Sequence, residues 1–587
     1  MILSASGWRK VFAISKNEQD KTPQINEEDR AISVAAAYAF FDYIKEKSGI
    51  DSPVLAVGID ARPTGRAIAD AVLRTLVKRG AIIQYLGLSS APEIMAYARK
   101  LDGFIYISAS HNPVGHNGIK FGKNDGGVLN AEENAKVTKA FLELLKDDSR
   151  LNTLVSDCLN CSSSLLQQVY QEEKSSKHNS LAAYKDFVKE TVSGSKDKTL
   201  QENFFSMIKS NAAEKAVGVV CDFNGSSRAA CIDRDFFTEN KIRFNSINDN
   251  EIVHEIIPEA ENLVHTAKQM EWLHSQGYSE YLLGYMPDCD GDRGNIVYWD
   301  EKKGKAVILK AQEVFSLSVL AELTYAIWKN KGNSEIKLGL SVNCPTSMRI
   351  NEIADILGAS LFRAEVGEAN VVNLAREKRS EGYEVPILGE GSNGGTITYP
   401  SSVRDPLNTV FALLKLLTIR EKGLYEIWCE KAGIDFKEDF TLTDILESLP
   451  SYTTTGVSEP RAVLKVKNSD HEKLKADFQK VFEKEWEEKK AGLKEKFGIC
   501  DYEAVITNGT KETRNVKDFS LSKKGGLKII FKDDRKKALA FIWMRGSGTE
   551  PVFRIMCDVK GNDKSALLEE KELLEWETQM IRKADKD

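Results

Sequence analysis

The chain has 587 residues, a formal net charge of −6 and an ordinary globular composition, with 42% hydrophobic and 29% charged residues. It is too long for a single hydrophobic core, which predicts about three to five domains, and its mild charge predicts no general attraction to nucleic acid or anionic lipid. No apolar run approaches the roughly 18 to 20 residues of a membrane span, and the N-terminus has no apolar stretch of signal-peptide length, so we expect a cytoplasmic protein.

One pattern of strand, polar turn and helix occurs three times along the chain. Apolar strands that end in a polar turn and lead into helical sequence are expected at 54–65, 216–227 and 336–347. Each is followed by a second apolar strand that runs into a polar, mostly Gly-containing loop, in GFIYISASHNPVGHNG, YLLGYMPDCDGDRGN and VPILGEGSNGGT. This alternation indicates three similar α/β domains with mainly parallel pairing. Ligands of such sheets bind beyond the carboxyl ends of the strands, where these loops lie.

The segment between the first two units, residues 151–179, is rich in Ser, Gln and Asn and is expected to be an insertion or a linker. It carries Cys158 and Cys161 at C-x-x-C spacing. Because no second cysteine pair and no adjacent His accompany them, we expect neither a metal nor a redox role. The nine cysteines are mostly single, which is typical of small buried hydrophobic residues in a reducing compartment.

The sequence changes character after the third unit, which LLKLLTIREKGLYEIW closes with a predicted helix. Residues 471–497 are highly charged, yet their apolar side chains recur at helical spacing, which predicts an amphipathic helix that covers a sheet rather than a coiled coil. Those side chains are Leu474, Phe478, Val481, Phe482 and Trp486. GGLKIIFKDD and ALAFIWMRGSGTEPVFRIMCDV alternate like strands. We therefore predict domains at 1–180, 181–305, 306–433 and 434–587, the last a smaller α+β domain.

The first polar loop, ISASHNPVGHNGIKFG, places Ser110 at the end of an apolar strand. A serine hydroxyl is a weak nucleophile unless a base or a metal assists it, and His111 and Lys120 are candidates for moving its proton. No G-x-S-x-G elbow is present, so the loop is not a hydrolase signature. Taken alone, this loop is equally compatible with a catalytic site and with a structural polar loop in which His111 only forms hydrogen bonds.

The second loop, YMPDCDGDRGN, contains three alternating aspartates, Asp288, Asp290 and Asp292. An extended chain directs every second side chain to the same side, so these carboxylates can converge on a hard divalent cation. An EF-hand is excluded, because Arg293 and Trp299 stand where its loop needs Gly and Glu. Three carboxylates, water and one further oxygen suit a Mg²⁺ that acts on phosphates. The alternative is an acidic surface turn.

The third loop, PILGEGSNGG at 386–395, contains G-x-G-x-x-G, which a dinucleotide-binding fold uses at the start of a helix. The residues after Gly394, Gly-Thr-Ile-Thr-Tyr-Pro, are a poor start for a helix, so we predict no NAD site. Glu390 and Ser392 on a glycine frame suit the hydroxyl groups of a sugar instead.

The fourth loop, RGSGTEPVFR at 545–554, contains the groups of an anion-binding site. The side chains of Arg545, Ser547 and Thr549 and the amides of Gly546 and Gly548 can bind a phosphate, with the guanidinium donating two hydrogen bonds. No G-x-x-x-x-G-K-[ST] is present, so a nucleotide-hydrolysing P-loop is not indicated. The alternative is a glycine hairpin with an exposed arginine.

In this order, the four loops resemble those of the α-D-phosphohexomutase superfamily, which includes phosphoglucomutase, phosphomannomutase and phosphoglucosamine mutase. The family's T-A-S-H-N-P stands here as SASHNP, D-G-D-G-D-R as DCDGDR, G-E-x-S-G as GEGSNG and R-x-S-G-T-E-P as RGSGTEP. SGWR at 6–9 is similar to the family's G-T-S-G-x-R segment, and RDPL from Arg404 is similar to its R-D-G segment. The resemblance covers nearly the whole chain.

The resemblance implies three similar α/β domains and a smaller α+β C-terminal domain like the TATA-binding-protein fold, arranged around a central cleft. It implies an isomerase that interconverts hexose 1-phosphate and hexose 6-phosphate through a phosphoserine at Ser110. Mg²⁺ bound by Asp288, Asp290, Asp292 and the Ser110 phosphate is the implied cofactor. A sugar phosphate is the implied small-molecule partner, and a sugar 1,6-bisphosphate is the implied intermediate and activator.

The same resemblance implies roles for individual side chains. The implied catalytic residues are Ser110, His111, Lys120 and Arg9. The implied substrate-binding residues are Arg293, Glu390, Ser392, Asn393, Arg545, Ser547, Gly548, Thr549 and Arg554.

Three features depart from the family pattern. Ser108 replaces Thr, and Cys289 replaces a Gly, which is tolerated if its φ is negative. Asn393 and Gly394 stand where many members have Gly and His, so the choice of sugar stays open. A phosphoglucomutase or a dual glucose and mannose enzyme is favoured, followed by a phosphoglucosamine mutase or a phosphopentomutase. A catalytically silent sugar-phosphate-binding protein is the alternative from another class, although binding alone needs no nucleophile.

Overall fold

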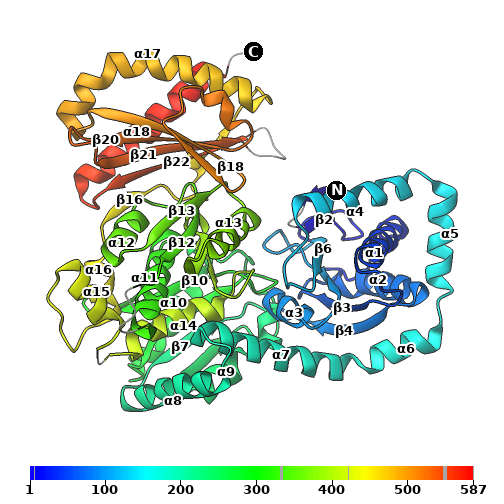
Figure 1. Ribbon diagram of the computed structural model, residues 1–587. Helices are drawn as coiled ribbons and strands as arrows, with labels where there is room; N and C mark the ends of the chain where they lie inside the picture. The colour runs from blue at the N-terminus through cyan, green and yellow to red at the C-terminus, as the bar shows by residue number, and fades with distance from the viewer. Residues whose placement is uncertain (5–6, 331–334, 421, 547–551, 586–587) are drawn as a thin grey trace. The chain divides into compact units, whose positions relative to one another are not determined.

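The computed structural model describes residues 1–4, 7–330, 335–420, 422–546 and 552–585 (Figure 1). The chain divides into two compact units. Unit 1 comprises Met1–Trp299, Gly304–Ile308 and Pro400–Phe411, and unit 2 comprises Asp300–Lys303, Leu309–Tyr399 and Ala412–Asp587. Among the described helices, none is both long and apolar enough to cross a membrane.

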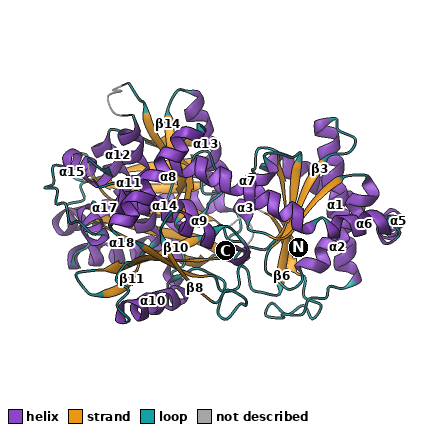
Figure 2. Cartoon of the chain, turned by 90° about the horizontal axis from the view of Figure 1, so that it is seen from below, coloured by secondary structure: helices purple, strands orange, loops and turns teal. Residues whose placement is uncertain are grey.

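The first sheet of unit 1 has the strand order β1-β2-β6-β5-β3-β4. These strands are β1 (Ile2–Ser4), β2 (Gly7–Val11), β3 (Val54–Ile59), β4 (Ile82–Leu88), β5 (Gly103–Ile107) and β6 (His116–Lys123). Alternate residues of β3 enter different cores, because successive strand side chains point to opposite faces. Leu55 and Val57 pack on the side of α1 (Glu27–Ser48) and α2 (Gly65–Arg79), and Ala56 packs on the side of α3 (Ala91–Ala98). Figure 2 shows the strands between these helices.

Residues 151–179, expected to be an insertion or linker, are almost entirely helical. They lie in α5 (Asp148–Leu159), α6 (Ser163–Gln171) and the start of α7 (Glu173–Ser193), between α4 (Ala131–Leu145) and α8 (Lys198–Glu214). The side chains of Asp147 and Ser162 cap the first two of these helices. Leu151, Leu154 and Leu166 pack against the core of the first sheet. The segment is therefore not an unstructured linker, because its polar residues cap helices and its leucines pack on the core.

The second sheet of unit 1 has the strand order β11-β10-β9-β7-β8. These strands are β7 (Gly218–Asp222), β8 (Arg243–Ile247), β9 (Tyr281–Pro287), β10 (Gly294–Asp300) and β11 (Lys305–Ile308). The helices of this region are the 3-10 helix η1 (Ser227–Ala230), α9 (Asp233–Glu239) and α10 (Ala260–Ser275). α10 packs on β9 and β7 through Leu263, Met270 and Leu273.

The third α/β sheet lies in unit 2 and has the strand order β13-β12-β14-β15. Its strands are β12 (Leu338–Asn343), β13 (Ser360–Ala364), β14 (Glu384–Glu390) and β15 (Gly395–Thr398). The associated helices are α11 (Ala311–Lys329), α12 (Arg349–Leu357), α13 (Glu368–Ser380) and the 3-10 helix η2 (Gly391–Asn393). The helix predicted in LLKLLTIREKGLYEIW is two helices, α14 (Pro406–Thr418) and α15 (Leu424–Ala432), and α16 (Leu442–Ser448) follows.

The three α/β sheets share one pairing pattern. The strands β3, β7 and β12 each pair in parallel with two neighbours. The strand after each polar loop, β6, β10 or β15, pairs antiparallel with the strand before that loop. Parallel pairing is thus confirmed on both sides of β3, β7 and β12. The first sheet is not mainly parallel, however, because its β1–β2, β2–β6 and β5–β6 pairs are antiparallel. The polar loops join antiparallel strands, because a short connection cannot span the crossover that a parallel pair needs.

A separate antiparallel sheet in unit 2 has the strand order β16-β22-β21-β20-β18-β19, with β17 also paired to β22. Its strands are β16 (Tyr452–Thr454), β17 (Val463–Lys465), β18 (Asp501–Asn508), β19 (Lys511–Arg514), β20 (Gly526–Lys532), β21 (Ala538–Gly546) and β22 (Val552–Lys560). The short helices η3 (Pro460–Ala462) and η4 (Phe519–Ser522) lie in its connections.

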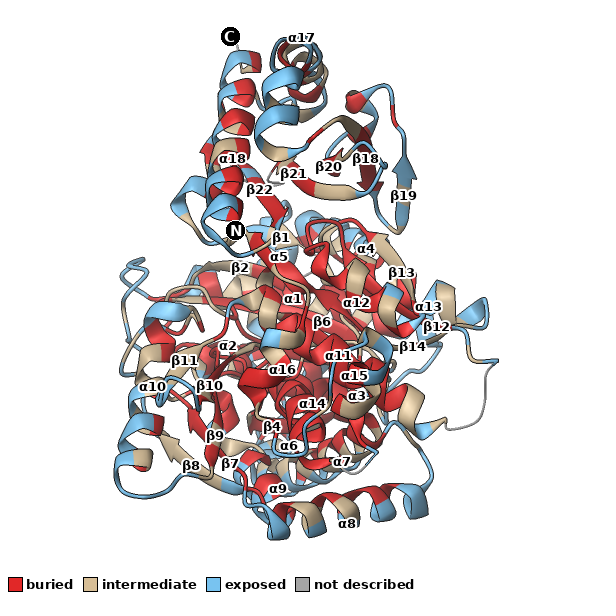
Figure 3. Cartoon of the chain, turned by 90° about the vertical axis from the view of Figure 1, so that its left-hand side faces the viewer, coloured by how far each residue is buried: buried red, intermediate tan, exposed pale blue. Residues whose placement is uncertain are grey.

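Two long helices, α17 (His471–Phe497) and α18 (Lys564–Ala584), cover this sheet. Phe478, Phe482 and Trp486 of α17 share a core with Phe531 of β20 and Trp576 of α18. Figure 3 shows buried and exposed residues on different sides of both helices. The amphipathic helix predicted at 471–497 is therefore confirmed, with its boundaries.

Candidate active site

Ser110 lies directly beyond β5 in a strained conformation. Its φ is +54°, in the left-handed region that residues other than glycine rarely adopt. Its side chain is nearly buried, and its hydroxyl donates a 2.8 Å hydrogen bond to Asp288 Oδ2. The backbone amide of Ser110 donates to the hydroxyl of Ser108 at 2.9 Å. The loop therefore holds this hydroxyl in one orientation, toward the aspartates.

The serine loop is held by Arg62, a residue for which the sequence predicted no role. The buried Arg62 guanidinium pairs with Asp60 at 3.2 Å. It also donates hydrogen bonds of 2.5 to 3.0 Å to four carbonyl oxygens of the loop, those of Ser110, Asn112, Pro113 and His116. The only sequence signal was a charged residue immediately after an apolar strand. Its partners lie about fifty residues away, so periodicity could not reveal them.

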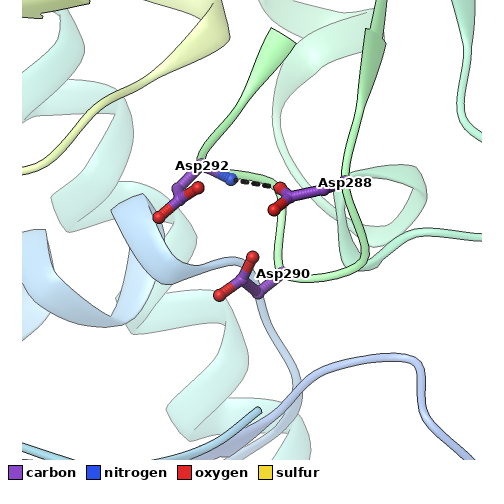
Figure 4. Close-up of side chains that lie close together, drawn as sticks. All are labelled: Asp288, Asp290 and Asp292. Carbon is purple, nitrogen blue, oxygen red and sulfur yellow. Dashed lines mark hydrogen bonds between the residues drawn. The ribbon is translucent and has the colours of Figure 1, made fainter. Parts of the chain in front are cut away.

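The three predicted metal ligands converge at the end of β9 (Figure 4). Carboxylate oxygens of Asp288, Asp290 and Asp292 lie within 4.8 Å of one another, and all three residues are buried. The backbone amides of Asp292 and Arg293 each donate to Asp288 Oδ1 at 3.2 Å. Burial, together with the charges of the other two carboxylates, raises the pKa of Asp288 well above its usual value. Cys289 has a negative φ, so the departure from Gly is tolerated, as expected.

Lys120 contacts this cluster directly. Its Nζ donates to Asp290 Oδ2 at 2.6 Å, and the Ser108 hydroxyl donates to the same oxygen at 3.1 Å. Burial alone would raise the pKa of Asp290, but the charge and hydrogen bond of Lys120 lower it below its usual value. Arg9 on β2 pairs with Gly118, two residues before Lys120 on β6, so both cationic side chains leave the same face of the sheet.

The cluster fits a divalent cation. Asp290 Oδ1 and Asp292 Oδ1 are buried and have no hydrogen-bond partner within the described part of the chain. Buried carboxylate oxygens without partners are costly unless a cation binds them. Across the residues that the structure describes, this is the only group of three or more His, Cys, Asp or Glu side chains that converges in this way. Cys158 and Cys161 are free and buried in the protein core.

Further positive charge surrounds the aspartates. Arg404 Nη2 forms an ion pair with Asp292 Oδ2 at 2.9 Å, and Arg293 Nε lies 4.0 Å from Asp288 Oδ2. Burial and then the nearby Arg293 and Arg9 lower the pKa of His111 to about 3, so its imidazole is neutral at physiological pH. The resemblance placed Arg404 in a family segment but assigned it no role, and only the structure brings it to the aspartate loop.

In unit 2 the predicted sugar loop is held by hydrogen bonds to Glu390 and Ser392, most of them from residues outside the loop. Glu390 accepts hydrogen bonds from the Gly367 amide at 2.8 Å, from Asn343 Nδ2 at 3.1 Å and from Asn393 Nδ2 at 3.2 Å. Asn343 also donates to the Ser392 hydroxyl at 3.0 Å. Asn343 ends β12 and was missed, because a single polar residue at a strand end carries no distinctive pattern.

The glycines of this loop serve a tight turn. Gly394 has a φ of +69°, and Gly395 opens a strand rather than a helix. A dinucleotide site needs a helix at this point. The prediction that this G-x-G-x-x-G is not an NAD signature is therefore confirmed.

Only part of the predicted phosphate loop can be placed, since Ser547, Gly548 and Thr549 lie outside the described residues. Arg545 on β21 and Arg554 on β22 face each other directly across the strand pair. Arg545 Nε pairs with Glu365 Oε1 at 2.9 Å, and Arg554 donates to the Val457 carbonyl at 3.2 Å. Two arginines at opposed positions repel, and an anion between them would relieve that repulsion.

The short segment 365–367 links the sugar and phosphate loops within unit 2. Glu365 pairs with Arg545, and the amide of Gly367, two residues later, donates to Glu390. Glu365 also accepts a hydrogen bond from Thr507 at 2.8 Å. The structure therefore brings residues of two predicted loops together through a third segment that the sequence did not single out.

Two models of the phosphoglucomutase/phosphomannomutase family match this chain. The model of its alpha/beta/alpha domain I matches residues 13–147, and the model of its alpha/beta/alpha domain III matches residues 318–432. These matches contain the serine loop and the sugar loop.

Curated relatives carry the name phosphoglucosamine mutase. The protein from Methanococcus maripaludis is 27% identical over 433 residues, which is 73% of this chain and 80% of that protein. The protein from Methanococcus aeolicus is 25% identical over 380 residues, which is 64% of this chain and 72% of that protein.

Solved structures share the fold over almost the whole chain. A phosphoglucomutase/phosphomannomutase family protein from Burkholderia thailandensis has a TM-score of 0.59 at 15% identity, covering 99% of this chain and 97% of that one. The phosphoglucomutase parafusin from Paramecium has a TM-score of 0.59 at 16% identity, covering 99% of this chain and 94% of that one. This similarity establishes the multidomain α/β architecture.

Proposed function

Because this chain belongs to the α-D-phosphohexomutase superfamily, whose members are isomerases, we propose that it interconverts the 1-phosphate and the 6-phosphate of a hexose. The observation that carries this proposal is the hydrogen bond from Ser110 to Asp288 inside the buried aspartate cluster. A nucleophilic hydroxyl beside a cation-binding cluster is the arrangement that phosphoryl transfer requires.

Asp288, Asp290 and Asp292 would hold Mg²⁺, which when bound supplies positive charge to the phosphoryl group and the oxygens that exchange it. The resting enzyme would carry a phosphate on Ser110. In the first half-reaction the bond from phosphorus to Ser110 Oγ breaks as a bond to the free sugar hydroxyl forms. The hydroxyl proton passes to Ser110 Oγ through Lys120 or His111. The bound sugar bisphosphate then returns its other phosphate to Ser110 by the reverse steps.

The remaining predicted residues would bind the substrate. Arg9 and Arg293 would neutralise charge on the transferred group, and the 2.9 Å ion pair between Arg404 and Asp292 Oδ2 would leave Asp292 Oδ1 for the cation. Glu390, Ser392 and Asn393 would bind sugar hydroxyls. The phosphate that does not react would be held by Arg545, Ser547, Gly548, Thr549 and Arg554. A free sugar 1,6-bisphosphate would activate the enzyme by phosphorylating Ser110.

Three sugars are the main candidates for the substrate. Glucose, alone or together with mannose, is the substrate that the loop motifs favour, and glucosamine is favoured by the names of the curated relatives. A substrate panel of glucose, mannose, glucosamine and ribose 1-phosphates, with Mg²⁺ and a trace of bisphosphate, would separate them.

Intact-mass detection of a phosphate on the Ser110 peptide tests whether the chain is a phosphoserine enzyme. A Ser110→Ala variant with full mutase activity would rule the mechanism out, and a phosphate-free Ser110 that binds sugar phosphates without turnover would indicate a binding protein.

A further inference from the structure

Arg228 is a fully buried arginine in η1 whose charge is matched entirely inside unit 1. Its guanidinium pairs with Asp233 Oδ1 at 2.8 Å and with Asp405 Oδ1 at 3.3 Å, and it donates to the Tyr184 hydroxyl at 2.8 Å. The Tyr184 hydroxyl in turn donates to Asp405 Oδ2 at 2.6 Å. A buried guanidinium requires such partners. It thereby joins α7, η1 and the residue before α14, which are distant in sequence.

The same side chain packs against the aspartate loop. Gly291, between Asp290 and Asp292, has a φ of +73°, and a Cβ on it would lie 2.5 Å from both Cγ and Cδ of Arg228. The backbone amide of Ser227, the residue before Arg228, donates a 3.1 Å hydrogen bond to the Cys289 carbonyl. η1 therefore supports the turn of the aspartate loop through backbone and side-chain contacts.

Arg228 also contacts the residue that follows Arg404. Asp405, which Arg228 and Tyr184 hold, directly follows Arg404 and caps α14 by accepting the Leu407 amide at 2.9 Å. With Asp405 fixed, Arg404 reaches Asp292 Oδ2 at 2.9 Å. The other oxygen, Asp292 Oδ1, is buried without a hydrogen-bond partner among the described residues. Arg404 thus occupies one oxygen of Asp292 and leaves the second for a cation.

We propose that Arg228 is a positioning residue of the active site, which acts through Asp405 and Arg404 to set the orientation of Asp292. This inference depends on one part of the proposed function, namely that the aspartate cluster binds a divalent cation. It assigns Arg228 a role that a buried ion pair does not have by itself, because its effect on Asp292 passes through Arg404 in addition to its direct packing on Gly291.

The affinity of the full chain for Mn²⁺ tests the inference. The electron paramagnetic resonance signal of free Mn²⁺ measures this affinity, so no substrate and no catalytic activity are needed. Arg228→Met and Arg404→Met should each weaken Mn²⁺ binding by about 10-fold or more, as loss of outer-shell partners does. The double variant should bind Mn²⁺ more tightly than the product of the two single effects predicts, because both substitutions break the same connection between Asp405 and Asp292. Wild-type affinity in Arg228→Met, or a double variant whose weakening is the product of the two single effects, would overturn the inference.

Arg228→Met leaves Asp233 and Asp405 without their cation and can fail to fold, so Tyr184→Phe provides a milder variant. It removes only the hydroxyl between Arg228 and Asp405 and should weaken Mn²⁺ binding in the wild-type background but not in Arg404→Met. An equal effect in both backgrounds would contradict the proposal. Arg234→Met is the matched control, because Arg234 lies on α9 nearby but is exposed and pairs with Asp249.

The two proposals fail separately. If the Mn²⁺ measurements show the expected coupling but no sugar phosphate on the panel is turned over, only the mutase assignment fails. If phosphoserine and mutase activity are found but the Arg228 and Arg404 effects multiply, only the positioning role fails.

Discussion

The hydroxyl of Ser110 donates a 2.8 Å hydrogen bond to Asp288, which lies 178 residues further along the chain. Ser108 and Lys120 of the first sheet bind Asp290 in the same way. The two loops therefore form one site, in which the proposed nucleophile and the proposed cation ligands are held by direct contact.

Removal of the cation should abolish activity. EDTA treatment should remove mutase activity and Mg²⁺ should restore it, because three buried carboxylates need a cation to neutralise them. Asp288→Asn should lower kcat by more than about 100-fold, beyond the range for outer-shell residues. Asp235→Asn, an exposed aspartate on α9, is the control and should retain wild-type activity. Full turnover in EDTA would contradict the metal site.

Arg62→Met should lower kcat by about 100-fold, because a displacement of roughly 1 Å in a reacting group has an effect of that order. The substitution removes the donor that four loop carbonyls share. Steady-state kinetics with the preferred sugar phosphate measure it. Arg66→Met changes an exposed arginine in α2 and should have no effect. Equal kinetics in both variants would show that Arg62 does not position Ser110.

Asn393→Ala should lower kcat/KM by about 10-fold, corresponding to the loss of about one or two hydrogen bonds. Asn393 donates to Glu390 and accepts from the Gly395 amide at 3.0 Å, so its loss frees the carboxylate that would bind the sugar. The comparison of glucose, mannose and glucosamine phosphates shows whether the loss differs between sugars. An unchanged kcat/KM for every sugar would remove this loop from substrate binding.

The free energy of unfolding should fall as the pH rises from about 4.5 to about 7, because of Glu569 in α18. Burial raises the pKa of Glu569 from 4.5 to about 7, so the folded state holds a proton that the unfolded state releases. The stabilising contribution is complete below pH 4.5 and is lost as the pH rises through 7. Thermal unfolding of Glu569→Gln should show a smaller fall over this range, whereas the exposed Glu575→Gln should behave like the wild type. Identical pH profiles for all three proteins would refute this assignment.

Sequence patterns within one short segment correctly predicted features that depend on that segment alone. The apolar period of residues 471–497 specifies one helix, and the alternation of Asp288, Asp290 and Asp292 specifies converging carboxylates, because both follow from the geometry of a single segment. The three strand and loop units specified the α/β class in the same way. Composition was less informative at residues 151–179, where Ser, Gln and Asn suggested an insertion or linker but buried Leu166 and partly buried Leu151 and Leu154 pack the helices on the core.

The sequence by itself determined which loops carry nucleophile, carboxylates and cations, because short-range spacing decides which side chains share a strand end. Only the tertiary structure decided which groups hold them in place. Arg62, Arg228, Arg404 and Glu365 each act on residues that are distant in the chain, through contacts that depend on burial and on the packing of separate elements. The partners of a buried charge are set by tertiary packing, so neither these partners nor the role of the charge can be predicted from sequence periodicity.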